Sequence, residues 1–249
     1  MQDRAAKTRR QLIRSAAQVF DRGGFAGSSI GQICALARVS QGALHFHFRN
    51  KHAVGEAVES TAAEILRCVV GPVPVWHPAP LQLLVDTSHA LARRVARDPV
   101  LRAGFGLALD PAWPGGASPW QHWREWVRGV LRLARRQGTL ASGVDLEGAV
   151  SAITAVTAGL DGLGRGPARA RSAPSMAPFW RLVLPQLATE AVRGRIEPAG
   201  SATAVELAAG RAREEPPLGR RRLDGWVTDA CAVMTDGELC RLPKVVSGK

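Results

Sequence analysis

Serine residues at two places near the N-terminus have the spacing that begins helices and binds phosphate oxygens. Ser28 and Ser29 precede an apolar run, so one hydroxyl can cap a helix while the other stays free for a phosphate. Ser40 is a second N-cap candidate, and it opens a short helix from 41 to about 46. The pattern predicts two short helices joined by a tight turn, which is a helix-turn-helix.

The second of these helices carries side chains suited to reading base edges. Gln41 offers a donor and an acceptor together, as an adenine edge requires, and Gly42 removes a side chain where backbone must approach DNA closely. Lys51 lies in the first turn of the next predicted helix, beside backbone amides that favour an anion. The residues that we expect to contact duplex DNA are Ser28, Ser29, Ser40, Gln41, Gly42, His45, His47 and Lys51.

The charge distribution favours the same function. Residues 1 to 52 hold nine lysine and arginine residues against two acidic ones, which accounts for seven of the chain's twelve net positive charges. Such an excess attracts phosphates without regard to sequence, and base contacts then impose selectivity. Two other interpretations stay open: a generic three-helix bundle in which Leu44, Phe46 and Phe48 are only core, and an architectural protein that binds nucleic acid through charge alone.

These residues resemble the operator-binding domain of the tetracycline-repressor (TetR) family. The family's recognition segment reads roughly Thr-x-Gly-Ala-Leu-Tyr-x-His-Phe-x-x-Lys, and here Ser40 to Lys51 reads Ser-Gln-Gly-Ala-Leu-His-Phe-His-Phe-Arg-Asn-Lys. The match extends over about residues 8 to 60. The chain departs from the pattern at His45, where the family usually has a tyrosine that reaches a phosphate. A neutral imidazole can still donate there, with a dependence on pH.

Length and composition allow a small DNA-binding domain and a larger helical one. The chain has 249 residues, of which 46% are hydrophobic, and apolar residues recur at helical spacing from 81 to 192 with no strand alternation. We predict an all-α protein with a three-helix helix-turn-helix domain over 1–52, a helical ligand-binding and dimerisation domain over 53–197, and a mostly disordered tail over 198–249. The last long helix is expected at about 174 to 192, with a kink at Pro185.

The last two predicted helices have smooth apolar faces. One is rich in alanine and glycine between Ala149 and Gly162, and the other carries aliphatic residues between Leu182 and Leu187. Such faces suit pairing across a two-fold axis, so we expect a homodimer. The alternative is that they only close their own domain.

The second domain further resembles the γ-butyrolactone receptor branch of the family. Residues 98–108 look like a stretch typical of that branch, and Trp120-x-x-Trp-Arg-Glu-Trp126 covers its tryptophan followed by arginine. In that branch the tryptophan lies in the pocket, where its N–H can bond a ligand oxygen, and the matching residue is Trp123. An indole supplies a flat apolar wall and one donor, which suits a small oxygen-bearing hydrophobic ligand. The candidate ligand contacts are Trp123, Trp120, Phe105, Leu109 and Thr154, against the alternative that the tryptophans are only core.

The resemblance implies a repressor that a ligand releases from DNA. A dimer would block transcription at a pseudo-palindromic operator, and a ligand would move the helix from 51 to 70 and spread the recognition helices. The branch typically controls antibiotic or other secondary-metabolite genes. It includes strongly basic pseudo-receptors that sense an antibiotic or an intermediate, and this chain's pI of about 11.1 fits that subtype. A multidrug-sensing repressor of an efflux gene is the alternative within the family.

Other classes of function find no support in the sequence. Its six histidines are not accompanied by a hydrolase, metalloprotease or dinucleotide motif, so we expect no enzyme and no cofactor. The four cysteines show no C-x-x-C spacing, so no metal site is expected. There is no apolar run of about 18 residues and no hydrophobic signal core at the N-terminus, so we expect a cytoplasmic protein with no membrane partner.

Overall fold

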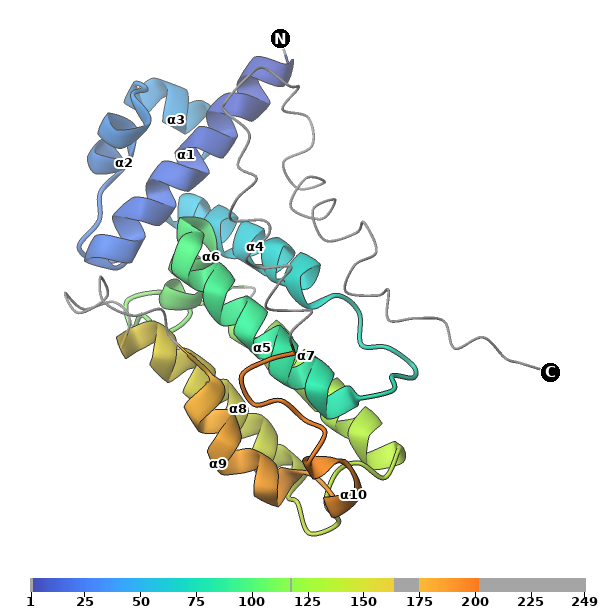
Figure 1. Cartoon of the computed structure of the whole chain (residues 1–249). Helices are drawn as coiled ribbons and strands as arrows, with labels where there is room; N and C mark the ends of the chain where they lie inside the picture. The colour runs from blue at the N-terminus through green and yellow to red at the C-terminus, as the bar shows by residue number, and fades with distance from the viewer. Residues whose placement is uncertain (1, 117, 164–174, 202–249) are drawn as a thin grey trace.

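The computed structural model describes residues 2 to 116, 118 to 163 and 175 to 201 (Figure 1). Its helices are α1 (Gln2–Gly23), α2 (Ile30–Ala37), α3 (Gln41–His47), α4 (Lys51–Val70), α5 (Pro80–Arg97), α6 (Pro99–Leu107), α7 (Pro119–Arg136), α8 (Leu146–Leu163), α9 (Ala177–Leu187) and α10 (Glu190–Arg193). The predicted all-α fold is confirmed. The expected tail from residue 202 onward lies outside the described residues.

The short helices begin where the sequence places their caps. Ser29 Oγ accepts the backbone N–H of Gln32 at 3.2 Å, and the Gln32 side chain accepts the Ser29 N–H at 2.8 Å, which completes a capping box. Ser40 caps α3 and Asn50 caps α4 through their side-chain oxygens. The three caps fix the directions of α2, α3 and α4 relative to one another.

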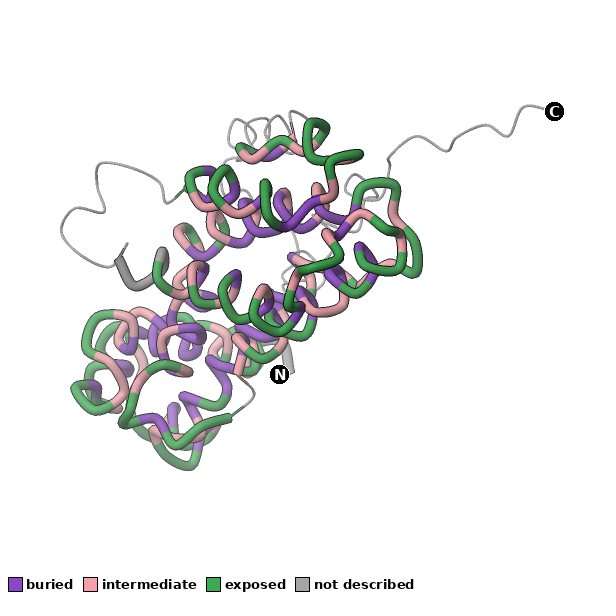
Figure 2. Tube along the Cα trace, turned by 90° about the horizontal axis from the view of Figure 1, so that it is seen from below, coloured by how far each residue is buried: buried purple, intermediate pink, exposed green. Residues whose placement is uncertain are grey.

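α6 joins the DNA-binding end to the rest of the molecule because it packs against both α1 and α4. The approach to α4 is close, since a Cβ at Gly104 would collide with Ala62. Arg102 on α6 adds an ion pair to Asp21 of α1, with 2.8 Å between Nε and Oδ2. Figure 2 shows the buried positions along the facing sides of the helices. One hydrophobic cluster runs from Leu12 of α1 to the C-terminal helices, so no break in packing marks the expected boundary at residue 52.

The C-terminal half is a helical bundle whose core holds large aromatic side chains. α7 packs against α4, α5 and α8, and it buries Trp123 completely. Trp180 of α9 is also completely buried, and its indole N–H donates to Ser88 Oγ of α5 at 2.8 Å. This hydrogen bond attaches α9 to the bundle.

The last described segment differs from the sequence expectation. The helix expected to run through Pro185 to about residue 192 ends at Leu187, two residues beyond the proline, where the backbone of Ala188 becomes extended. Ala188 pairs instead with Leu140, and the short α10 follows. Ser201, which falls within the expected tail, donates two hydrogen bonds to the Asp86 carboxylate of α5, from its N–H at 2.7 Å and from its hydroxyl at 2.9 Å.

The described helices show neither a membrane-spanning segment nor a cluster of metal ligands. None of them is long and apolar enough to cross a bilayer. Within the described ranges, no group of three or more histidine, cysteine or acidic side chains is placed to hold a metal ion.

Candidate functional site

The outer face of α3 presents the side chains expected to meet DNA. Gln41, Gly42 and His45 are exposed and His47 is partly exposed, whereas Leu44 is completely buried beneath them. The helix is anchored at its start by Ser40, whose hydroxyl accepts the Ala43 N–H at 3.1 Å. A short helix anchored on one side and polar on the other has the form that a major groove admits.

Phe46 is a surface residue of α3 that the sequence analysis named only as possible core. Its side chain is 80% exposed, although large aromatic side chains are normally buried. The helical period gives the signal that could have found it, because two residues correspond to about 200° and so place Phe46 opposite the buried Leu44. Its ring meets the ring of His47 edge-on at 5.1 Å. An apolar side chain on this face can contact a thymine methyl group.

The two serines before α2 have different roles. Ser29 is exposed and caps the helix. The expectation that the other serine stays free is wrong, because Ser28 is 6% exposed and its hydroxyl donates to the carbonyl of Phe25 at 2.7 Å. The Ser28 hydroxyl is therefore engaged in the turn after α1. The Ser29 hydroxyl also donates, to Gln32 Oε1 at 3.2 Å, but it is the more exposed of the two.

The Lys51 ammonium, which was expected to contact a phosphate, is bound by groups within the fold. Its Nζ donates to the carbonyls of Phe25 at 2.8 Å and Ser28 at 3.0 Å, and it lies 4.4 Å from the centre of the Phe25 ring. An ammonium has three N–H donors, so one remains for another acceptor. The residue therefore joins the start of α4 to the turn between α1 and α2.

The turn between α2 and α3 contains a strained residue. Arg38 has a φ of 52°, which places it in the left-handed region that glycine adopts without cost. Its N–H bonds to the carbonyls of Ala35 and Cys34 at the end of α2. The Gln11 side chain of α1 donates to the carbonyl of Ala37 at 2.7 Å and holds the turn from behind.

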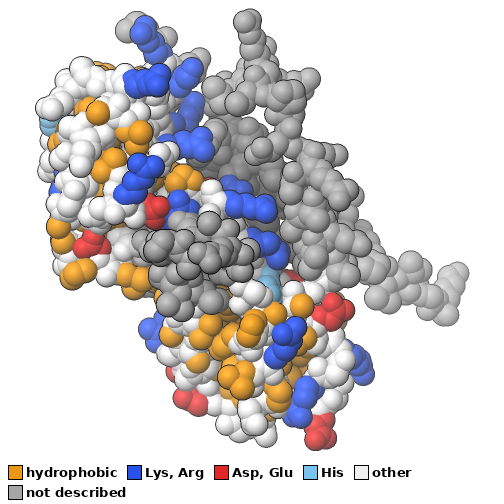
Figure 3. Space-filling model, turned by 60° about the vertical axis from the view of Figure 1, so that its left-hand side comes forward, with side chains coloured by type: hydrophobic (Ala, Val, Ile, Leu, Met, Phe, Trp, Pro, Cys, Tyr) orange, Lys and Arg blue, Asp and Glu red, His pale blue; other side chains and the backbone are white. Residues whose placement is uncertain are grey.

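Basic side chains extend the charged surface beyond α3. Along α1, Arg4, Lys7 and Arg14 are exposed. Figure 3 shows lysine and arginine side chains gathered on the upper lobe, where α1 lies, and few acidic ones beside them. This surface has the charge that draws a protein to phosphates.

Trp123 combines complete burial with an indole N–H that has no hydrogen-bond acceptor among the described residues. Buried tryptophan N–H groups normally find a partner, and leaving one unpaired costs free energy. Trp126, which stacks on Trp123 with 5.4 Å between ring centres, also has an unpaired buried N–H. The sequence analysis did not place Trp126 at the ligand site. The two indoles offer donors for a small molecule with oxygen acceptors.

The other expected ligand contacts divide into buried and exposed positions. Phe105 is buried, and its carbonyl accepts the Trp120 N–H at 3.0 Å, so that Trp120 has no donor left for a ligand. The Thr154 hydroxyl donates to the carbonyl of Val150 in its own helix. Leu109 follows the end of α6 and is 58% exposed, and its contact with a ligand stays a prediction.

A buried carboxyl group lies where α4 meets the loop after α6. Glu59 is 1% exposed, its Oε2 accepts the Trp113 N–H at 3.3 Å, and its Oε1 has no partner among the described residues. Burial raises the pKa of Glu59, the hydrogen bond from Trp113 lowers it, and the nearby charge of Glu56 raises it further. The net direction is upward.

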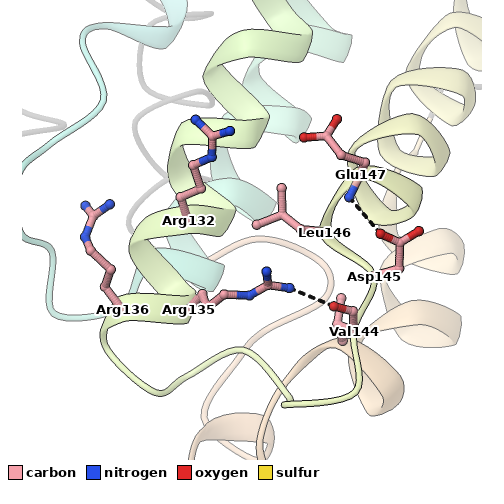
Figure 4. Close-up of a pocket in the computed structure, with 7 residues that line it drawn as sticks. All are labelled: Arg132, Arg135, Arg136, Val144, Asp145, Leu146 and Glu147. Carbon is pink, nitrogen blue, oxygen red and sulfur yellow. Dashed lines mark hydrogen bonds between the residues drawn. The ribbon is translucent and has the colours of Figure 1, made fainter.

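A surface pocket of about 590 Å³ lies at the C-terminal end of α7, whereas Trp123 lies near its N-terminal end. The pocket is lined by Arg132, Arg135 and Arg136 of α7 and by the segment from Val144 to Glu147, and Figure 4 shows Arg135 reaching toward Val144. Arg135 donates to the carbonyl of Val144 at 2.7 Å. None of the five expected ligand contacts lines this pocket, so it is separate from the site at Trp123.

Comparisons with known proteins agree with this geometry. The model of the family described as bacterial regulatory proteins, tetR family, matches residues 12–58. The A-factor receptor protein of Streptomyces griseus is 31% identical over 215 residues, which cover 86% of this chain and 74% of that protein. A crystal structure of a γ-butyrolactone receptor described as ArpA-like is 28% identical with a TM-score of 0.65, covering 85% of this chain and 99% of its own.

A solved structure with DNA is equally similar. The TetR family protein CprB from Streptomyces coelicolor, in complex with its biological operator sequence, is 28% identical with a TM-score of 0.64 and covers 85% of this chain and 99% of its own. The family model covers the helix-turn-helix, and the relative and the solved structures also cover most of the helical bundle behind it. The chain therefore belongs to the TetR family of bacterial regulatory proteins and is a transcriptional regulator and not an enzyme.

Proposed function

We propose that this protein is a cytoplasmic repressor that binds a pseudo-palindromic operator as a homodimer and leaves it when a γ-butyrolactone-type ligand binds beside Trp123. The regulated genes would be those of antibiotic or other secondary-metabolite synthesis. The relatives support this choice of ligand class, because they are an A-factor receptor and γ-butyrolactone receptors.

The observation that carries the proposal is the unpaired N–H of the completely buried Trp123. A lactone or hydroxyl oxygen would satisfy this donor, and the stacked Trp126 would supply an apolar wall for an alkyl chain. A buried tryptophan that only contributes to packing normally has a hydrogen-bond acceptor for its N–H. Trp180 in the same bundle has an acceptor in Ser88.

The operator-reading surface supports DNA binding with base preference. Gln41 and Gly42 lie exposed at the first turn of α3, where a recognition helix meets base edges. His45 and Phe46 extend the same exposed face. The basic residues of α1 supply the attraction that is independent of sequence.

An apolar face on the C-terminal helices supports dimerisation. Ala152 and Ala155 of α8 and Pro185 of α9 are exposed, and Leu182 of α9 is 78% exposed. Figure 3 shows hydrophobic side chains gathered on the lower lobe, where these helices lie. A second copy of the chain related by a two-fold axis would cover this face and would place two α3 helices on successive major grooves.

The test begins with a duplex selected by the purified protein from a random-sequence library. Fluorescence anisotropy then measures binding of that duplex in moderate salt while a synthetic γ-butyrolactone is added. We expect release by the butyrolactone from the wild-type protein, and release weakened at least about tenfold in Trp123→Phe, which keeps the ring and loses the donor. Trp180→Phe is the matched control.

The outcomes separate the competing functions. Release by an antibiotic or a biosynthetic intermediate, but not by butyrolactones, would make the protein a pseudo-receptor or a drug-sensing repressor. Binding of all duplexes with equal affinity would make it a non-specific nucleic-acid-binding protein. A Trp123→Phe variant that is released like the wild type would remove the ligand role from this indole.

A further inference from the structure

The loop between α6 and α7 contacts the turn that precedes the helix-turn-helix. Asp110 Oδ2 accepts the backbone N–H of Phe25 at 2.6 Å, and Phe25 lies between α1 and α2. The neighbouring Gly24 has a φ of 65°, and a Cβ there would come within 2.8 Å of the same carboxylate oxygen. A left-handed glycine therefore gives the Asp110 carboxylate access to the backbone of this turn.

Trp113 of the same loop fills the space between this turn and α4. Its ring meets Phe25 edge-on with 4.9 Å between centres and stacks on His52 at 4.8 Å. Its N–H donates to Glu59. Gly55 makes the close approach to α4 feasible, because a Cβ there would lie 2.5 Å from the Trp113 ring. The loop thus contacts both the turn before α2 and the first half of α4.

Both backbone polar groups of Phe25 are hydrogen-bonded to side chains. Its N–H is bound by Asp110, and its carbonyl accepts Lys51 Nζ at 2.8 Å. α2 begins five residues after Phe25, and Lys51 is the first residue of α4. A movement of the loop after α6 would therefore be transmitted directly to the start of the helix-turn-helix.

The other end of the loop leads to the proposed ligand site. Trp120, in the first turn of α7, donates to the Phe105 carbonyl of α6 at 3.0 Å, and the two rings are 4.2 Å apart. Trp123 follows one turn later on α7. The two helices that flank the loop are thus joined next to the unpaired indole.

We infer that Asp110 and Trp113 form a clamp through which the α6–α7 loop positions the helix-turn-helix and couples it to the core at Trp123. This inference rests on the proposed function. The α6–α7 loop is then a second connection, in addition to α4, between the ligand site and the helix-turn-helix. Asp110 is a positioning residue that does not contact DNA. Coupling of two sites is reciprocal, so DNA bound at α3 should also change hydrogen exchange in the loop.

Hydrogen–deuterium exchange of the full chain tests the clamp without requiring the ligand. The probe is the duplex selected by the wild-type protein, and exchange is followed with and without it in the wild type, in Asp110→Asn and in Asp145→Asn. Asp110 accepts N–H groups on both oxygens, from Phe25 and Ala112, and an asparagine has only one acceptor oxygen. Asp145 accepts two N–H groups in the same manner, from Glu147 and Gly148 in the first turn of α8, and is the matched control.

In the wild type, we expect the duplex to slow exchange over residues 108 to 116 by roughly threefold or more, since opening and DNA binding are linked. In Asp110→Asn, exchange over residues 24 to 28 should be about tenfold faster in the free protein, and the duplex should no longer slow exchange in the loop. Its affinity for the duplex should stay within about threefold of the wild type, because the variant leaves α3 unchanged. Asp145→Asn should behave as the wild type.

Each other result overturns a defined statement. A wild-type protein that selects no duplex would overturn the proposed function and this inference with it. The clamp alone would be overturned if the wild-type protein bound its duplex without slower exchange over residues 108 to 116. It would also be overturned if exchange in Asp110→Asn, with and without the duplex, matched that of the wild type. An Asp110→Asn protein that has lost its folded structure would also overturn it, because Asp110 would then be a stabilising residue only.

Discussion

Trp123 and Trp180 are both completely buried in the same helical bundle, but only Trp180 has a hydrogen-bond acceptor, the Ser88 hydroxyl at 2.8 Å. The two indoles therefore differ in what their N–H groups contribute. The Trp180 N–H stabilises the fold, and we propose that the Trp123 N–H binds a ligand. A pair of identical substitutions separates these contributions.

Trp180→Phe should lower the free energy of unfolding more than Trp123→Phe does. The first substitution removes a buried hydrogen bond, worth about 1 kcal/mol, and the second removes a donor that has no partner. Both lose similar packing, so the difference isolates the hydrogen bond. Thermal and denaturant unfolding of the two variants measure it. A larger loss for Trp123→Phe would mean that this indole is a structural group.

Phe46→Ala should reduce affinity for the selected duplex while leaving stability almost unchanged. The side chain is 80% exposed, so its removal opens no cavity. Phe48→Ala is the contrasting change, since Phe48 is 4% exposed and its truncation should cost about 3–5 kcal/mol. Anisotropy and thermal unfolding report the two effects separately. A loss of stability in Phe46→Ala with unchanged duplex binding would contradict a DNA-contacting role.

Lys51→Met should weaken binding to all duplexes alike and also destabilise the protein. The substitution removes two hydrogen bonds to carbonyls and the cation above the Phe25 ring, together about 1–3 kcal/mol. Because one N–H remains for a phosphate, the salt dependence of binding should also flatten by about one charge. Lys7→Met removes an exposed charge from α1 and should flatten the salt dependence without the loss of stability.

Leu182→Arg should convert the protein to a monomer if α8 and α9 form the dimer interface. Leu182 is 78% exposed in the single chain, so an arginine there costs the isolated fold little. In a dimer the same charge would be buried without a partner. Light scattering after size-exclusion chromatography gives the mass of each species. Arg181, exposed beside it, provides the control substitution Arg181→Ala, and a dimeric Leu182→Arg protein would place the interface elsewhere.

The sequence predicted the local features of this fold well because they depend on neighbouring residues. A cap at one of the two serines before α2 and a cap at Ser40 follow from helix-start chemistry, and both form, the first of them at Ser29. Arg38 is harder to anticipate, because a left-handed turn usually carries glycine and nothing in the local sequence marks an arginine for that conformation. Pro185 was recognised as a disruption, but the pairing of Ala188 with Leu140 that follows it depends on a distant segment.

Contacts between distant segments account for what the sequence missed at the site. Ser28 and Lys51 were assigned from their places beside helix starts, which do not show that both side chains bind the turn at Phe25. The Trp123 assignment came from a resemblance, but its unpaired donor depends on every side chain packed around it. Asp110 and Phe25 are separated by 85 positions, and no local pattern relates them.

Glu59→Gln should make the protein more stable relative to the wild type as the pH rises. The pKa of Glu59 is raised, so above the ordinary value of 4.5 the folded carboxyl keeps its proton where the unfolded one has lost it. The folded state then binds more protons, and the free energy of unfolding of the wild type falls with pH until the raised pKa is passed. Glutamine does not titrate, and its oxygen can still accept the Trp113 N–H. Unfolding measured from pH 4.5 to 8 should show the variant gaining on the wild type until the raised pKa of Glu59 is passed, and a constant difference above it. Parallel curves for Glu59→Gln and the wild type would mean that the buried carboxyl carries no desolvation cost.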